Sequence, residues 1–397
     1  MKANQDEQTP NKGSHLGWLS LWLDRSQRYR TLPLLLLPLI LLSMTHPSFT
    51  HCSSPKKSLS LTDTSSQPPL QLVFYNVENL FDTINDPTTN DEDFLPTGVL
   101  HWNKHRYSTK LKKIGWVLSN IAGWQLPDII GLVEIENRRV IEDLLQHPSL
   151  RHKAYSYAVT KGADPRGIDV ALIWDRYRFQ RIGAWEIPHY GKPLRYPLRK
   201  DQRTTSEREG SGRNSLWVRL EDKVTKVRYD LFVIHAPSRR QGTKVSGTKR
   251  QKVLQKVYQN IHKLLGSDPD RRIIVMGDFN DNPSNPPVRH GLHSRPFSST
   301  PTAPDSLYNL ATKVEQQGEG THRFQRQMWV PDQFLISRTL CTEVLGEGMI
   351  VFRHPQLLDR KGQSLRRTYQ GRHYKGGYSD HLPILLRILP APASPQE

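Results

Sequence analysis

Short apolar runs that end in polar turn residues recur along the chain. The clearest run covers residues 273–276 and is followed by Gly277 and then by four Asp and Asn residues between positions 278 and 282. A run of this length, bounded by glycine and turn formers, predicts a strand that is buried on both faces and stops at a loop. Similar runs predict strands at residues 71–75, 129–133, 170–174, 229–234, 334–337 and 382–388.

Three further segments carry apolar residues at helical spacing, at about residues 108–122, 140–145 and 249–265. Ser108 is the expected N-cap of the first helix, and Gly123 and Gly266 are the expected ends of the first and third. Residues 82–102 are acidic and rich in turn formers, which predicts a loop. Because strands and helices interleave with several strand-only connections, the pattern predicts a mixed sheet covered by helices.

An apolar run of 13 residues at positions 32–44 follows three arginines near the amino terminus. It contains two prolines and is short for a membrane span, which is typical of the apolar region of an export signal. The polar lead before it is long, so an uncleaved membrane anchor stays open as the alternative. Cys52 follows where a bacterial lipoprotein cysteine could lie, although His51 is larger than the residue that such a site prefers.

We therefore predict an exported protein, in the periplasm, on the cell envelope or in the medium. Residues 1–52 are interpreted as a signal peptide or membrane anchor and residues 53–69 as a linker rich in Ser, Thr and Pro. Residues 70–390 are interpreted as one domain and residues 391–397 as a tail. We expect a monomer, with membrane association through the N-terminal segment where that segment is retained.

The chain carries 56 Lys and Arg against 38 Asp and Glu, a formal net charge of +18. Such a surplus favours a polyanionic partner, either nucleic acid or an anionic membrane surface, and charge alone does not separate the two. The only cysteines, Cys52 and Cys341, do not form a disulfide framework and leave the redox compartment open.

Polar side chains that suit metal and phosphate chemistry stand where the predicted strands start or end. They are Asn76, Glu134, Asp278, Asn280, Asp380, His235 and His381. Each alone has an ordinary structural explanation, but their shared position indicates one site at the end of a sheet. Oxygen ligands at this density suit Mg²⁺, and also Mn²⁺ or Ca²⁺. In phosphodiester hydrolysis a hard cation and a histidine neutralise the phosphate, and a carboxylate aligns the attacking water.

Six motifs give these residues a family context. They are NVENLF (76–81), IIGLVEIEN (129–137), VIHAPSRR (233–240), MGDFND (276–281), PDQFLIS (331–337) and YSDHLPI (378–384). Together they resemble the metal-dependent endonuclease/exonuclease/phosphatase superfamily, which includes deoxyribonuclease I, abasic-site endonucleases, neutral sphingomyelinases and inositol polyphosphate 5-phosphatases. The resemblance covers about residues 70–390 in the expected order. It implies a four-layer α/β/β/α sandwich with the active site at one end of two packed sheets.

The resemblance also implies roles for single residues. Asn76 and Glu134 match the divalent-metal site, and Asp380 matches an additional carboxylate of that site. Asp278 matches the carboxylate that orients or deprotonates the attacking water, and Asn280 matches its positioning partner.

Two histidines complete the implied catalytic set. His381 matches the histidine that binds the scissile phosphate, and Asp332 matches the carboxylate that holds its ring. His235 matches a second active-site histidine, a candidate general acid. Asp164 is the expected partner of His235, with Asp169 as the competing choice.

Three arginines are candidate phosphate ligands. Arg203 is a loose match to the family's phosphate-contacting arginine, and Arg239 and Arg240 follow the His235 segment, where they could grip flanking phosphates. The first functional hypothesis is an exported Mg²⁺-dependent endonuclease, with DNA favoured as substrate. The second is a phospholipid or small phosphate-ester hydrolase at the cell envelope. The third, an inactive binding module, is disfavoured because every expected catalytic residue type is present.

Overall fold

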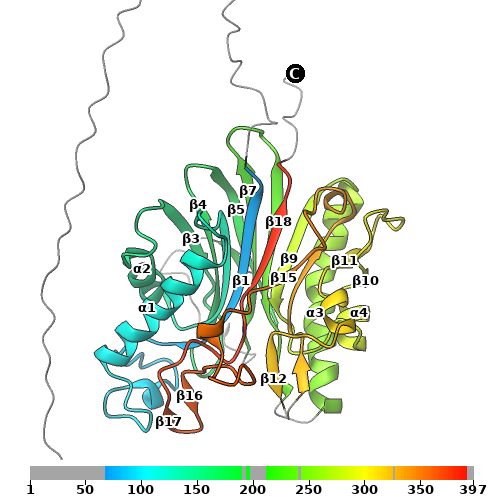
Figure 1. The fold of residues 1–397 in the computed structure, drawn as a ribbon. Coiled ribbons are helices and arrows are strands. Elements are labelled where there is room, and N and C mark those ends of the chain that lie inside the picture. The colour runs from blue at the N-terminus through cyan, green and yellow to red at the C-terminus, as the bar shows by residue number, and fades with distance from the viewer. Residues whose placement is uncertain (1–67, 190–193, 197–211, 240–242, 325–326, 391–397) are drawn as a thin grey trace, which may run out of the picture. The chain divides into compact units, whose positions relative to one another are not determined.

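The computed structural model describes residues 68–189, 194–196, 212–239, 243–324 and 327–390 (Figure 1). The chain divides into two compact units, Met1–Ser58 and Leu59–Glu397, and every described residue belongs to the second. The expected signal or anchor, the linker to residue 67, the tail, Arg203 and Arg240 all lie outside the described residues. Among the helices that are described, none has both the length and the apolar character that a membrane crossing requires.

The first sheet is built around β1 (Leu70–Leu80). β1 pairs in parallel with β2 (Ile129–Ile135) and antiparallel with β18 (Ile384–Ile388), so the beginning and end of the domain lie side by side. In the described chain the complete strand order is β15-β18-β1-β2-β4-β3. The remaining strands are β4 (Asp169–Asp175), β3 (Tyr155–Val159) and β15 (Ile350–Val351).

The second sheet has β9 (Arg272–Asp278), the strand predicted from the clearest apolar run, near its centre. β9 pairs in parallel with β8 (Arg228–His235) and antiparallel with β14 (Asp332–Ile336). The order of its described strands is β10-β11-β14-β9-β8-β7-β5-β6. The others are β5 (Phe179–Pro188), β6 (Leu194–Tyr196), β7 (Asn214–Asp222), β10 (Ser294–Pro296) and β11 (Leu307–Asn309).

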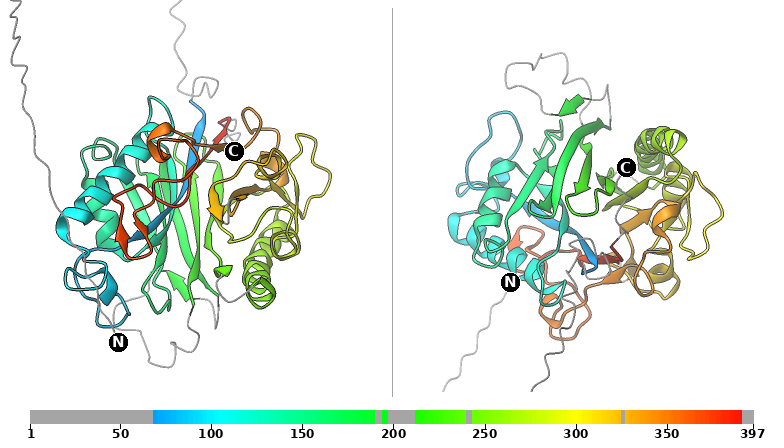
Figure 2. Two further views of the ribbon diagram at one scale, coloured as in Figure 1. Left: turned by 60° about the horizontal axis from the view of Figure 1, so that its bottom comes forward. Right: turned by 90° about the horizontal axis from the view of Figure 1, so that it is seen from above.

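The two sheets pack face to face, and helices cover their outer faces (Figure 2). α1 (Lys104–Asn120) and α2 (Arg138–Gln146) lie on the first sheet, while α3 (Thr243–Ser267) and α4 (Pro286–Gly291) lie on the second. A short α5 (Thr312–Gln316) follows β11. The predicted four-layer α/β/β/α sandwich is therefore confirmed.

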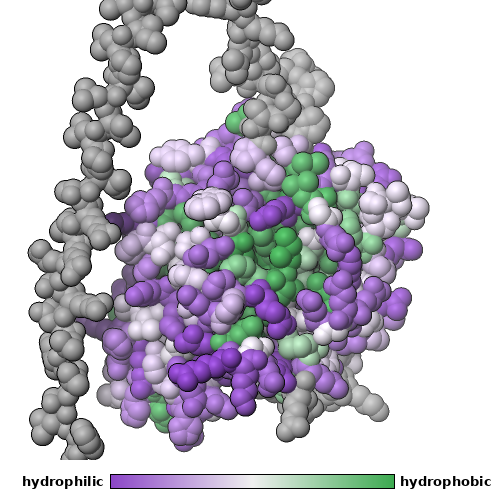
Figure 3. All heavy atoms as spheres, in the orientation of Figure 1, coloured by the Kyte–Doolittle hydropathy of each residue, from purple (hydrophilic) through white to green (hydrophobic). Residues whose placement is uncertain are grey.

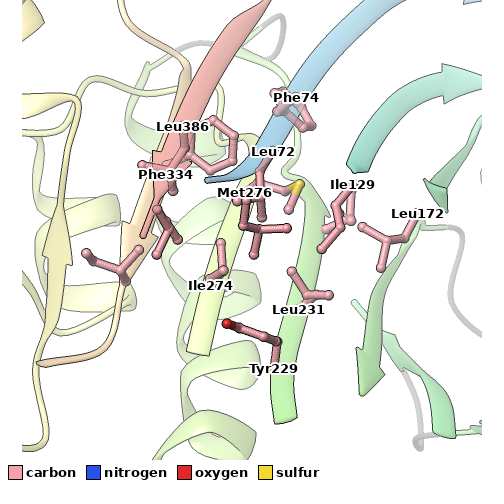
Figure 4. Packing of buried hydrophobic residues seen from close by; sticks show 14 of the residues in the cluster. Leu72, Phe74, Ile129, Leu172, Tyr229, Leu231, Ile274, Met276, Phe334 and Leu386 are labelled. Carbon is pink, nitrogen blue, oxygen red and sulfur yellow. The ribbon is translucent and has the colours of Figure 1, made fainter. Parts of the chain in front are cut away.

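Successive side chains of a central strand point to opposite faces of the sheet, and both faces are covered, one by the other sheet and one by helices. On β9, Ile274 and Met276 belong to the core between the sheets, while Ile273 and Val275 pack toward the helices (Figure 4). All four are fully buried, and burying one such side chain stabilises the fold by roughly 1.5–3 kcal/mol. Gly131 faces this core, where a Cβ atom would lie 2.5 Å from the sulfur of Met276, so a larger residue there would force the Met276 side chain to shift.

Two helix boundaries differ from the expected ones. α1 begins at Lys104 and its N-cap is Asn103, whose side chain accepts a hydrogen bond from the Arg106 N–H, so Ser108 lies inside the helix. α3 begins at Thr243 and runs through Gly266 to Ser267. Apolar spacing marks only the turns that face the core, so it misses polar turns at helix ends.

Two small hairpins lie at the end of the sandwich where β1 stops (Figure 1). One is formed by β12 (His322–Phe324) and β13 (Gln327–Trp329), and the other by β16 (Tyr369–Gln370) and β17 (His373–Tyr374). Single-turn 3₁₀ helices occur at Glu92–Phe94, Arg338–Leu340 and Pro355–Leu357.

Candidate active site

Three strands of the second sheet bring their polar ends together. In the parallel β8–β9 pair His235 lies opposite Asp278, and in the antiparallel β9–β14 pair Asp332 lies opposite the same residue. β14 therefore starts where β8 and β9 stop. All three side chains are buried at this end of the sheet.

The first sheet supplies the other half of the site. Asn76 on β1 donates from Nδ2 to Oδ2 of Asp278 at 2.9 Å, which joins the two sheets through a buried hydrogen bond. Glu134 on β2 places Oε1 3.7 Å from Nε2 of His235. His381, just before β18, places Nε2 3.9 Å from the Asp278 carboxylate. Segments far apart in the sequence therefore converge on Asp278.

The ring of His381 is held as the resemblance implied. Its Nδ1 lies 2.7 Å from Oδ2 of Asp332, which also accepts a hydrogen bond from the hydroxyl of Thr321. Burial opposes protonation, but the carboxylates of Asp332, Asp278 and Asp380 raise the pKa of His381 well above its usual value. The ring is therefore an imidazolium at neutral pH in the metal-free protein.

Asp278 is oriented by the turn that follows it. Its Oδ1 accepts the N–H of Asn280 at 2.8 Å, and the Asn280 side chain donates to the backbone oxygen of Ala236 at 3.1 Å. Burial raises the pKa of Asp278 to about 6, with further contributions from Asp332 and Glu134 that the charge of His381 partly offsets. A carboxylate of this basicity can accept a proton from an attacking water near neutral pH.

His235 is buried between carboxylates and arginines. Its Nε2 lies 3.7 Å from both Glu134 Oε1 and Asp278 Oδ2, and its Nδ1 has no hydrogen-bond partner among the described residues. Burial, and then the charges of Arg213 and Arg166, lower the pKa of His235 well below its usual value. The free protein therefore holds a neutral ring here, which suits a hydrogen-bond donor better than a general acid.

Neither Asp164 nor Asp169 contacts His235 as expected, so both predicted partners are wrong. Asp164 instead accepts a hydrogen bond from Nε of Arg213 at 3.1 Å, and Asp169 accepts one from the hydroxyl of Thr160 at 2.8 Å. Arg213 is the residue before β7, a strand that was not predicted from the sequence. Its contact with Asp164 depends on tertiary packing that the spacing within GADPRGID does not reveal.

The donor set at this end of the sandwich fits a hard divalent cation. Asn76, Glu134, Asp278 and Asp380 offer carboxylate and amide oxygens, and Oδ1 of Asn79 is buried without a hydrogen-bond partner among the described residues. Two sets of residues place potential ligand atoms within 4.8 Å of one another: His322 with Asp380 and His381, and Asp278 with Asp332 and His381. The first of these sets has two imidazoles and one carboxylate, and the second has two carboxylates and one imidazole. The oxygen donors of Asn76, Glu134, Asp278 and Asp380 suit Mg²⁺, Mn²⁺ or Ca²⁺.

Backbone conformation near the candidate metal ligands is strained. Asn79 and Glu134 have φ values of 56° and 62°, and Asn280 has 52°. Non-glycine residues held in this left-handed region cost on the order of 1–3 kcal/mol each and cluster at ligand sites. The Glu134 carboxylate is fixed by the Asn79 N–H at 3.0 Å, so the strained turn presents it to the site.

The sequence that builds this site matches a known protein family. Residues 71–389 match the family model described as "Endonuclease/Exonuclease/phosphatase family". The chain belongs to this family. The chain is thus a hydrolase of a family whose members are phosphoesterases that depend on divalent metal ions.

Two solved structures with TM-scores of 0.50 show the same fold at low sequence identity. An endonuclease/exonuclease/phosphatase family protein from Bacteroides thetaiotaomicron has a TM-score of 0.50 and 15% identity, covering 82% of this chain and 98% of that chain. A protein of the same description from Bacteroides vulgatus has a TM-score of 0.50 and 12% identity, covering 81% and 99%. The human Nocturnin catalytic domain has a TM-score of 0.46 and 18% identity, covering 81% and 94%. No curated protein matches the chain.

Two residues of this family member's site were not predicted from the sequence. Arg367 donates to Oδ2 of Asp380 at 2.6 Å, and Nδ1 of His322 lies 2.8 Å from the backbone oxygen of Asp380. Burial opposes ionisation of Asp380, but the charges of His381, His322 and Arg367 lower its pKa. Neither residue follows a predicted strand. His322 lies shortly before the PDQFLIS motif, and Arg367 lies in a run of Lys and Arg at residues 360–375, so each has a signal in the sequence.

Arg239 is the one predicted phosphate ligand whose side chain is described. Its guanidinium lies 4.1 Å from the centre of the Trp329 ring and 3.7 Å from Oδ1 of Asp281. Asp281 also forms a 2.7 Å buried ion pair with Arg250. Stacking on Trp329 holds Arg239 beside the loop that carries Asn280.

Proposed function

We propose that this protein is a divalent-metal-dependent phosphodiesterase that cleaves nucleic acid, with DNA favoured, as an endonuclease that acts after export. The observation that carries the proposal is the placement of Asp278 between a protonated His381 and a neutral His235. This arrangement puts a base beside two imidazole rings that can donate hydrogen bonds to a phosphate.

The roles follow from the charges of the residues. Asp278 accepts the proton of the attacking water, while Asn280 and Asn76 hold its carboxylate in place. The imidazolium of His381 neutralises a non-bridging phosphate oxygen, and neutral His235 donates a hydrogen bond to the phosphate. A divalent cation bound by Asn76, Glu134 and Asp380 would add positive charge at the phosphate and at the leaving oxygen.

Charge supports nucleic acid as the substrate class. The formal net charge of +18 favours a polyanion over a single small ester. The proposal also includes that the protein is a monomer and is exported. The apolar run at residues 32–44 would serve as its signal or anchor. Cell fractionation followed by sizing of the recovered protein tests this part.

A lipid headgroup is the second candidate substrate, and one observation favours it. Phe324, on the β12–β13 hairpin two residues after His322, is 52% exposed. An exposed aromatic ring beside a phosphate site is a means of contact with a membrane surface.

A hydrolysis panel distinguishes the substrates. Plasmid DNA, RNA, sphingomyelin and inositol phosphates would each be incubated with Mg²⁺, Mn²⁺, Ca²⁺ or chelator. We expect nicking of the plasmid with a divalent metal and none with chelator. Asp278→Asn should lower that rate by about 10²-fold or more, because it removes the base. Cleavage of sphingomyelin without cleavage of DNA would replace the first candidate with the second.

A further inference from the structure

Two cationic segments that lie far apart in the sequence form one surface beside the active site. Residues 104–113 contain five Lys and Arg and residues 360–375 contain six, and neither segment contains Asp or Glu. Arg106 stacks 4.4 Å from the centre of the Tyr374 ring, and the buried Nζ of Lys110 donates to the hydroxyl of Thr368. The surface made by these two segments is called the cationic face below.

The charges of the cationic face are available to a ligand. Lys104, Arg372 and Lys375 are exposed, and none of them is paired with a carboxylate within the described residues. Several arginines elsewhere in the domain are neutralised, as in the pairs of Arg213 with Asp164 and of Arg219 with Asp230. Uncompensated positive charge concentrated on one surface attracts polyanions.

The cationic face is continuous with the active site. Arg367 lies in the second segment and binds Asp380 at 2.6 Å. The N–H of Thr368 donates to the buried carboxylate of Glu78 at 2.6 Å, which fixes the segment against the end of β1. β16 and β17 accordingly lie beyond the end of β1 in Figure 1. A chain of phosphates bound here therefore leads directly to the catalytic residues.

The chemistry of the cationic face favours a polynucleotide over a membrane. None of the large apolar side chains that are exposed in the described domain belongs to either segment. Tyr369 and Tyr374 pack against each other, with ring centres 5.4 Å apart, and are half-buried. The corresponding region of Figure 3 is mostly hydrophilic. Peripheral membrane binding relies on inserted apolar groups, whereas backbone binding of nucleic acid relies on cations.

We propose that the cationic face binds the sugar–phosphate backbone of a nucleic acid that extends from the scissile phosphate, without reading its sequence. This inference deepens the proposed function and rests on it for the identity of the bound polymer. Neutralising phosphates releases condensed counterions, so the face also makes binding strongly dependent on salt.

The test measures DNA binding by the full-length protein with chelator present, so that binding is separated from cleavage. The triple variant Lys104→Ala/Arg372→Ala/Lys375→Ala would be titrated into a labelled 30-base-pair duplex at several salt concentrations. We expect at least tenfold weaker binding at about 0.1 M salt and a slope of log K against log salt that is shallower by about 2–3, since each lost contact changes it by about 0.9.

A matched control removes three exposed cations near the opposite end of the sandwich, in the variant Arg181→Ala/Lys223→Ala/Lys263→Ala. β8 runs from that end toward His235 and α3 runs back, so these positions lie away from the site. The control should keep the wild-type slope. Equal slopes in all three proteins, or equal losses in both variants, would overturn the proposal.

Phosphatidylserine vesicles provide the competing arm. If the first triple variant loses vesicle binding and keeps DNA binding, the face is a membrane surface and the proposal is wrong. Failure of the proposed function is a separate result, because it appears as absence of metal-dependent DNA cleavage by the wild-type protein whatever its salt slope.

Discussion

Asn76 and Asp278 are 202 residues apart in the sequence and join the two sheets through a 2.9 Å hydrogen bond between an amide and a carboxylate. The bond is buried, and its acceptor is the carboxylate on which both active-site histidines converge. One polar contact therefore links the half of the site on β1 directly to the half on β9.

Loss of this contact should reduce catalysis in a way that depends on Asp278. Asn76→Ala removes a donor to a buried carboxylate, so we expect about 10²-fold lower turnover and a fall of about 1–3 kcal/mol in the free energy of unfolding. Asp278→Asn should reduce turnover at least as much, and the double variant should be little worse than the more impaired single variant. Steady-state kinetics and urea unfolding give both quantities. Fully additive losses in turnover would mean that the two residues act independently.

Glu134 should be required for metal binding. Glu134→Ala should abolish the rise in melting temperature that Mg²⁺ or Mn²⁺ causes in the wild-type protein, because the strained turn at Asn79 presents this carboxylate to the site. Metal-dependent hydrolysis should fall by about 10²–10³-fold or more. Glu142→Ala, an exposed carboxylate on α2, is the control and should keep both properties. A wild-type metal response in Glu134→Ala would remove Glu134 from the metal site.

Asp332 should act through the ring of His381 rather than through the substrate. Asp332→Asn keeps a hydrogen-bonding group near Nδ1 but removes the negative charge that stabilises the imidazolium. We therefore expect kcat to fall by about 10²-fold or more while KM changes much less. Kinetics on a DNA substrate check the split. A large rise in KM with unchanged kcat would assign Asp332 to substrate binding.

The buried amine of Lys110 should make stability depend on pH. Burial lowers the pKa of Lys110 to about 8 from its ordinary value of 10.5. Between these two values the unfolded chain binds a proton that the folded protein does not, so this group makes the free energy of unfolding rise as pH increases from 8 to 10.5, by up to about 3 kcal/mol.

The Lys110→Met variant should lack this contribution. The difference in unfolding free energy between wild type and Lys110→Met, measured by urea at pH values from 7 to 10.5, should grow toward high pH in favour of the wild type. Lys112→Met, which removes an exposed lysine of the same helix, should run parallel to the wild type. A constant difference for Lys110→Met would mean that its amine stays protonated throughout.

Much of the site was predictable because its residues lie beside strands with clear apolar patterns. Five of its residues lie on strands at the same end of the sandwich: Asn76, Glu134, His235, Asp278 and Asp332. An apolar pattern that locates the strand ends therefore also locates these candidate catalytic residues. The pairing of Asp332 with His381 was likewise available from the family motifs.

The amino-acid sequence by itself determined the central strands, the covering helices and the order of the catalytic motifs, because burial on both faces requires continuous apolar runs. Only the tertiary structure decided that Asp164 binds Arg213, that Arg367 holds Asp380 and that two distant cationic segments form one surface. Such contacts depend on side-chain direction and on the packing of irregular segments. Neither side-chain direction nor the packing of irregular segments produces a periodic pattern in the sequence.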